Sequence, residues 1–117
     1  MIILNKHKIE PTYFPDKTSQ IWNLPVSILD LKKFEILWEF SSESEFFHLA
    51  QLKELLDSYG GRTVLKISYL PYARQDKEIS NNTTFALRPF CNLLNSLKFD
   101  EIEGFVTLAL FLFQIKE

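Results

Sequence analysis

Residues 63–77, TVLKISY followed directly by LPYARQDK, decide the fold of this chain. The first seven residues are dominated by β-branched, aliphatic and aromatic side chains, which is typical of a buried strand. Pro71 ends that strand, and the polar residues Arg74, Gln75, Asp76 and Lys77 follow in a row. In open α/β sheets, ligands bind beyond the carboxyl ends of the strands. The sequence therefore predicts a ligand-binding loop at a strand end.

The side chains of this loop suit a phosphorylated ligand. The guanidinium of Arg74 offers a fork of donors that matches phosphate oxygens. Gln75 can both donate and accept hydrogen bonds, and Asp76 can orient the arginine or hold a water on a metal. Polar residues are also common after strand ends, so a plain surface loop remains an alternative at this point.

The rest of the chain predicts alternating strands and helices. Strands are expected at residues 1–4, 34–40 and 101–105, with helices at 43–59 and 83–97. Strand and helix alternating at this spacing favours βαβ units and a parallel sheet. We therefore expect an α/β fold with a mostly parallel sheet flanked by helices.

The strand expected at 34–40 has a clear two-sided pattern. One face carries only apolar residues, namely Phe34, Ile36, Trp38 and Phe40, whereas Glu35 and Glu39 lie on the other. This alternation predicts a strand that is half exposed and lies near a sheet edge.

Both helices carry end signals. Ser42 and Glu45 have the spacing of a capping box, in which each side chain bonds a free backbone amide. Gly60 is placed to end the first helix. In the second helix, Pro89 predicts either a kink or a start near Arg88, because proline cannot donate the backbone bond of a helix interior.

Composition limits the class of protein. A length of 117 residues suggests one domain, and the net charge of −2 gives no argument for nucleic-acid or membrane affinity. The single cysteine, Cys91, excludes an internal disulfide and favours a reducing compartment, here the cytoplasm. Its place on an apolar stripe predicts a buried, inert thiol. His7 and His48 are interpreted as a solvated residue and a helix-surface residue.

The loop at 70–77 closely resembles the ATP-binding segment of the ribose-phosphate pyrophosphokinases, also called PRPP synthetases. Asn92 and the two leucines after it fall where that family has Asn-Leu-Leu, and residues 99–102 are similar to the start of its next strand. The turn containing Phe14 and Asp16 is weakly similar to a Phe-x-Asp-Gly-Glu loop of the family. The resemblance implies a phosphoribosyltransferase-like fold and makes residues 1–117 one half of a two-domain enzyme.

The resemblance also implies an activity and a site. The family transfers pyrophosphate from Mg²⁺-bound ATP to ribose 5-phosphate, which yields PRPP and AMP in nucleotide biosynthesis. Carried over, ATP or ADP would contact Arg74, Gln75, Asp76 and Lys77. Phe14 and Asp16 would receive the adenine of a neighbouring subunit, so a homo-oligomer is implied.

The chain departs from the family at several places. Lys17 and Thr18 stand where the family prefers Gly and Glu, and Val106 and Leu108 replace an Asp-x-His whose histidine helps to bind Mg²⁺-ATP. No metal ligand is evident in residues 1–117, and we expect the second domain with the ribose-phosphate site to be absent. We therefore assign no catalytic residue and expect weak nucleotide binding without catalysis by this chain alone.

A second hypothesis remains open, in which the chain is a non-catalytic oligomerisation or regulatory module derived from such an enzyme. Eight of the nine residues at 105–113 are apolar. This run is too short to span a bilayer as a helix. It predicts either a buried segment or a patch that binds a partner chain.

Overall fold

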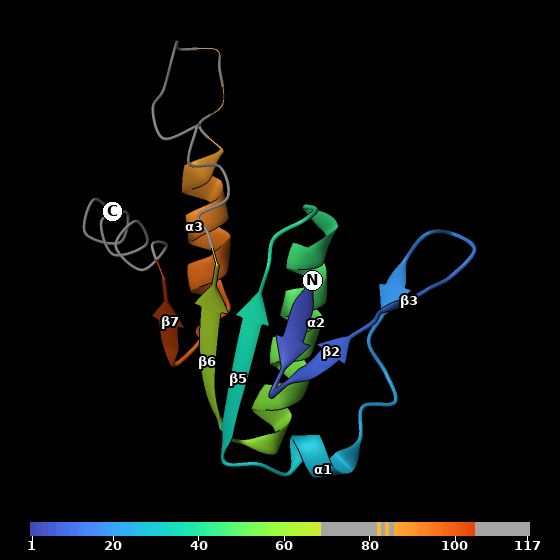
Figure 1. Ribbon diagram of the computed structural model, residues 1–117. Coiled ribbons are helices and arrows are strands. Elements are labelled where there is room, and N and C mark those ends of the chain that lie inside the picture. The colour runs from blue at the N-terminus through green and yellow to red at the C-terminus, as the bar shows by residue number, and fades with distance from the viewer. Residues whose placement is uncertain (69–81, 83, 85, 105–117) are drawn as a thin grey trace.

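A five-stranded sheet with strand order β2-β1-β5-β6-β7 forms the centre of the molecule (Figure 1). The computed structural model describes residues 1–68, 82, 84 and 86–104. The strands of this sheet are β1 (Ile2–Leu4), β2 (His7–Ile9), β5 (Lys33–Trp38), β6 (Arg62–Ile67) and β7 (Glu101–Glu103). A separate hairpin pairs β3 (Thr12–Tyr13) with β4 (Ser19–Gln20).

The described helices are α1 (Val26–Leu29), α2 (Ser44–Tyr59) and α3 (Leu87–Ser96). The chain runs from β5 through α2 into the parallel strand β6, and α3 precedes β7, which is parallel to β6. The predicted α/β fold with parallel βαβ units is therefore confirmed for this part of the chain.

The sheet is mixed rather than mostly parallel, which corrects the prediction. β1 pairs antiparallel with both β2 and β5. The reason is a tight turn at Asn5 and Lys6, whose φ angles of 45° and 69° reverse the chain directly after β1. Turns with two positive φ angles match the twist of adjacent antiparallel strands. The chain therefore folds back as a hairpin instead of crossing over through a helix.

The core lies between one face of the sheet and the two long helices. The buried cluster joins strand residues to apolar residues of α2 and α3: Ile2, Leu4, Phe34, Ile36, Trp38, Leu65, Ile67, Leu49, Leu52, Leu56, Leu87, Phe90, Cys91 and Leu94. In Figure 1, β1 and β6 pass in front of α2 and α3, so both long helices cover the same face. No helix among the described residues covers the other face.

Strand β5 is central rather than near an edge, which also corrects the prediction. Its alternation was interpreted correctly: Phe34, Ile36 and Trp38 are fully buried, whereas Lys33 and Glu35 are exposed. The exposure of one side of β5 arises from the uncovered face and not from an edge position.

The helix ends agree with most of the sequence signals. Gly60 ends α2 in a left-handed conformation with φ 79°. Pro89 lies in the first turn of α3, where a helix amide has no intrahelical partner anyway. Of the predicted capping box only one half forms: the Glu45 carboxylate accepts hydrogen bonds from the backbone amides of Ser41 and Ser42.

Candidate functional site

The carboxyl ends of the neighbouring strands β5 and β6 lie side by side. Trp38 and Ile67 are the last pair in register, and the Ser68 amide donates to the Trp38 carbonyl over 3.3 Å. The chain then enters residues 69–81, which lie outside the described part. The four residues predicted to bind ATP, namely Arg74, Gln75, Asp76 and Lys77, belong to that segment. The predicted loop therefore begins at the carboxyl ends of the strands, which is where ligands bind in open α/β sheets.

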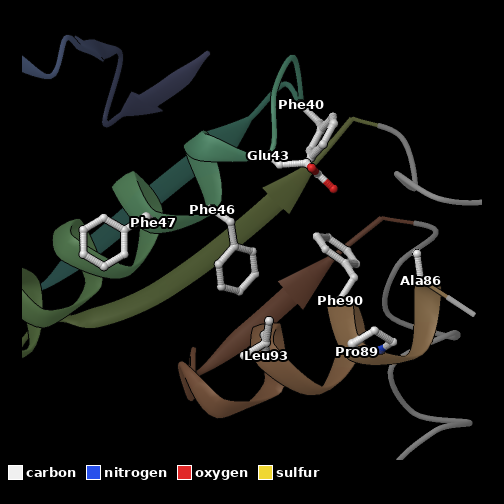
Figure 2. Close-up of a pocket in the computed structure, with 8 residues that line it drawn as sticks. All are labelled: Phe40, Glu43, Phe46, Phe47, Ala86, Pro89, Phe90 and Leu93. Carbon is white, nitrogen blue, oxygen red and sulfur yellow. The ribbon is translucent and has the colours of Figure 1, made fainter. Parts of the chain in front are cut away.

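An apolar pocket of about 380 Å³ opens where the amino ends of α2 and α3 face each other (Figure 2). The connection after β5 contributes Phe40 and Glu43. The two helices and the residue before α3 supply the rest of the lining: Phe46, Phe47, Ala86, Pro89, Phe90 and Leu93.

Aromatic rings form the inner wall of this pocket. The ring centroids of Phe46 and Phe90 lie 6.0 Å apart at 70°, an edge-to-face arrangement, and both rings pack against the buried Trp38. Phe47 and Leu93 are more than half exposed at the mouth. The pocket therefore offers a surface for an apolar or planar group that enters from solvent.

Among the described lining residues, Glu43 is the one with a charged side chain, and Figure 2 shows its carboxylate beside the ring of Phe40. A carboxylate repels phosphate. The described lining could therefore contact the apolar part of a nucleotide, whereas its phosphates would need cationic residues from elsewhere.

The two predicted adenine-binding residues, Phe14 and Asp16, lie together in the turn between β3 and β4. Phe14 is 43% exposed, and its amide and carbonyl close the turn through Thr18 and Lys17. One Asp16 carboxylate oxygen accepts from the Thr18 hydroxyl at 2.6 Å and the Thr18 amide at 3.0 Å. These bonds hold the pKa of Asp16 below its ordinary value.

This hairpin is remote from the apolar pocket. In Figure 1 the β3–β4 turn projects on the side of the molecule opposite to α3, next to α2. A hydrogen bond from the Ile21 amide to the Gln51 side chain fixes its base against that helix. Within one chain, the structure therefore does not bring Phe14 and Asp16 to the pocket between α2 and α3.

His48 is buried, which contradicts its interpretation as a helix-surface residue. It is only 4% exposed, and its Nε2 lies 3.4 Å from the hydroxyl of Tyr13. Burial lowers the pKa of His48, although the nearby Glu45 partly opposes that shift. The signal was present in the sequence, because His48 lies four residues before Leu52 on the apolar stripe of α2.

Glu45 is a further polar centre that sequence reasoning treated only as a cap. Its carboxylate accepts from the Ser41 amide at 2.7 Å, from the Trp38 indole at 3.4 Å and from the amino group of Met1. Burial would raise the pKa of Glu45, but the hydrogen bonds from the Met1 amino group and from Ser41 and Ser42 lower it to about 2. It is therefore an anion held for structure.

Cys91 is fully buried, as predicted, and burial raises the pKa of its thiol to about 11. Within residues 1–68, 82, 84 and 86–104, no group of three or more His, Cys, Asp or Glu side chains could hold a metal ion. In the same part of the chain, no helix is long and apolar enough to cross a membrane.

Comparison of the chain with models of known protein families and with curated proteins gives no match.

Proposed function

We propose that this chain is a nucleotide-handling domain of the ribose-phosphate pyrophosphokinase type, in which residues 74–77 bind ATP or ADP. The observation that carries the proposal is the parallel pairing of β5 with β6, which brings Ser68 to the carboxyl edge of the sheet. Arg74 follows Ser68 by six residues, a reach of at most about 20 Å. The loop therefore begins where phosphorylated ligands bind in this class of fold.

The pocket between α2 and α3 supports the same proposal. It opens near that edge, and its aromatic wall offers a surface for the apolar part of a nucleotide. In this proposal Arg74 and Lys77 would supply the positive charge that the described part of the lining lacks. Mg²⁺ prefers oxygen ligands and keeps several of its waters, so it would arrive coordinated by the nucleotide phosphates.

The β3–β4 turn fits a role in a neighbouring subunit. Phe14 and Asp16 are exposed and do not line the pocket between α2 and α3. Lys17 in the same turn has a left-handed φ of 69°. Glycine adopts that conformation without strain, and Gly is the residue the family prefers at this place. The left-handed φ at Lys17 is therefore compatible with the glycine that the family prefers at this place.

The proposal concerns binding, and no residue is assigned a catalytic role. Calorimetric titration with Mg²⁺-ATP tests it on wild type, Arg74→Ala and the control Arg62→Ala. Arg62 pairs with Glu101 at the amino ends of β6 and β7, the end of the strands opposite to the loop. The Arg62→Ala substitution therefore removes one positive charge, as Arg74→Ala does, but far from the loop. We expect weak binding in wild type and the control, and a loss of about tenfold or more in Arg74→Ala. Equal affinities in all three proteins, or no heat in any, would refute the proposal.

A non-catalytic oligomerisation module is the second candidate. The observation that favours it is the exposure of Phe47 and Leu93 at the mouth of an apolar pocket, because exposed apolar patches mark interaction surfaces. Light scattering over a wide concentration range tests this reading, and a monomer at every concentration counts against it.

A further inference from the structure

We infer that residues 105–113 of this chain dock in the apolar pocket between α2 and α3. Eight of these nine residues are apolar and none is charged, so the segment is stabilised only where it leaves water. The segment itself lies outside the described residues. The described part of the chain shows where the segment begins and which surfaces lie within its reach.

The segment begins near the inner wall of the pocket. Gly104, the residue before it, lies against β6, because a Cβ atom on Gly104 would be only 2.6 Å from the carbonyl oxygen of Ile67. Ile67 is paired in register with Trp38, whose ring packs against Phe46 and Phe90 of the pocket wall. Neighbouring strands lie about 4.8 Å apart, so the segment begins roughly 10 Å from Trp38.

The segment and the pocket also lie at the same end of the molecule. β7 runs parallel to β6, and the amino ends of α2 and α3 lie at the carboxyl ends of these strands (Figure 1). Nine residues span up to about 30 Å when extended and about 14 Å as a helix. Either length exceeds the roughly 10 Å that separates the start of the segment from Trp38.

The mouth of the pocket exposes apolar side chains that a docked segment would cover. Phe47 of α2 is 63% exposed and Leu93 of α3 is 55% exposed, and Figure 2 shows them on the two facing helices. Exposed apolar patches of this kind mark contact sites. A nine-residue apolar segment can cover both side chains at once and fill the hollow between them.

The uncovered face of the sheet is the other large surface near the end of β7, and its charges argue against it. Lys33, Glu35, Lys66 and Glu103 form ion pairs there with N–O distances of 3.1, 3.9 and 3.8 Å. An uncharged segment laid over them would remove these groups from water without offering new partners, which is costly. The described lining of the pocket contains a single charged residue, Glu43. The pocket is therefore the surface that matches the composition of the segment.

The covalent connection favours the segment of the same chain over that of a second copy. A segment tethered within reach of its site has an effective concentration in the millimolar range. At micromolar protein concentration, the same segment of a second copy is about a thousandfold more dilute. The docked segment is therefore expected to come from the same molecule.

The docked segment would occupy the aromatic wall that the proposed function assigns to the apolar part of a nucleotide. Segment and nucleotide then compete for one pocket, and the segment lowers the apparent affinity for ATP or ADP. This consequence rests on the proposed function, whereas the docking of the segment does not.

Disulfide cross-linking in the full chain tests the docking. Leu93→Cys places a thiol at the mouth of the pocket, and it is combined with one cysteine in the segment at a time. The segment variants are Leu108→Cys, Leu110→Cys and Leu112→Cys. Oxidised glutathione supplies the oxidant. The native Cys91 is fully buried, and its raised pKa keeps it a thiol, so it stays out of the exchange.

Two matched controls replace the cysteine at the pocket. Ser58→Cys lies at an exposed position of α2, roughly 16 Å further along the helix than Phe47. Lys66→Cys lies on the uncovered face. We expect about tenfold or more intramolecular disulfide with Leu93→Cys than with either control. Non-reducing gels and mass spectrometry of the linked peptides measure the yield, and circular dichroism confirms that every variant is folded.

Three results would overturn the inference. Equal yields at the three positions would show that the segment has no preference for the pocket. A higher yield with Lys66→Cys would place the segment on the uncovered face. A disulfide found only between two chains would show that the pocket takes the segment of a second copy.

Calorimetry with Mg²⁺-ATP tests the competition separately. Leu110→Asp adds a charge to the segment, should release it from the pocket and should tighten ATP binding by about threefold or more. An unchanged affinity would contradict the competition. No heat in either protein would refute the proposed function, and the cross-linking yield then decides the docking alone.

Discussion

Neighbouring residues of β5 lie in opposite surroundings. Trp38 is fully buried beneath α2 and α3, whereas Leu37 points to the face that no described helix covers. The covered face is packed with aromatic and aliphatic side chains. The uncovered face instead bears ion pairs, such as Lys33 with Glu35 at 3.1 Å and Lys66 with Glu103 at 3.8 Å.

The two faces therefore differ in how much they contribute to the stability of the fold and in how freely their residues can change. Burial of apolar area on the covered face supplies most of the free energy of folding. Exposed ion pairs contribute little, so the uncovered face can change its charges at small cost. Substitutions on the two faces should therefore differ strongly in their effect on unfolding, even between adjacent residues of one strand.

The largest effect is expected for Trp38→Ala. The substitution removes a fully buried ring that packs against Phe40, Phe46 and Phe90, and should lower the free energy of unfolding by about 3–5 kcal/mol. Leu37→Ala is the matched control on the other face, and we expect it to cost less than about 1 kcal/mol. Urea unfolding at low protein concentration measures both. Similar losses in the two variants would contradict the separation of the faces.

The next effect concerns the anion beside Trp38. The pKa of Glu45 is about 2 in the folded chain, below its ordinary value of 4.5. A lowered folded-state pKa means that the stabilisation is complete above about pH 4.5 and is lost as the pH falls toward 2. For a fully shielded carboxylate this difference would correspond to about 3 kcal/mol, and solvent screening at this partly exposed position reduces it to about 2 kcal/mol.

Unfolding of wild type and Glu45→Gln at pH 7, 4.5 and 3 tests this linkage. Wild type should lose stability between pH 4.5 and 3, and the variant should lose clearly less. Glu54→Gln, at an exposed position of α2, is the control and should keep the wild-type pH dependence. If Glu45→Gln retains the full acid sensitivity, another carboxyl group carries it.

Much of the covered face could be predicted because it depends on local periodicity. The stripe of Leu49, Leu52 and Leu56 identified α2, and the alternation from Phe34 to Trp38 identified the buried side of β5. Gly60 marked the end of α2 because glycine adopts a positive φ without strain.

The sheet order could not be predicted in the same way. β1 and β2 are only three residues long, too short to show a period, and their turn at Asn5 and Lys6 lacks the usual glycine. The central position of β5 and the uncovered face follow from strand pairing, which is a tertiary property.

The candidate site shows a similar limit. The ligand-binding role of Arg74 and Gln75 stays a prediction from the sequence, because their segment lies outside the described residues. The apolar pocket could not be found from the sequence, because it joins Phe40 and Phe46 to Pro89 and Leu93, which lie more than forty positions away in the chain. His48 was misplaced because a polar residue on an apolar stripe was assumed to face solvent.

The smallest changes in the free energy of unfolding are expected for substitutions of two lysines, one on each face of the sheet. Lys53 on α2 is only 5% exposed, pairs with Asp57 and lies 5.5 Å from the centre of the Phe99 ring, whereas Lys66 lies on the uncovered face. We expect Lys53→Ala to cost about 1–2 kcal/mol, because the buried methylenes lose their packing.

Lys66→Ala should cost less than about 0.5 kcal/mol, since its partners Glu35 and Glu103 remain solvated. Lys53→Met keeps the buried stem without the charge and should stay within about 1 kcal/mol of wild type. Chemical denaturation of the three variants at pH 7 gives the comparison. An equal cost for the two alanine variants would mean that the uncovered face is packed as tightly as the covered one, and that a covering layer is already in place.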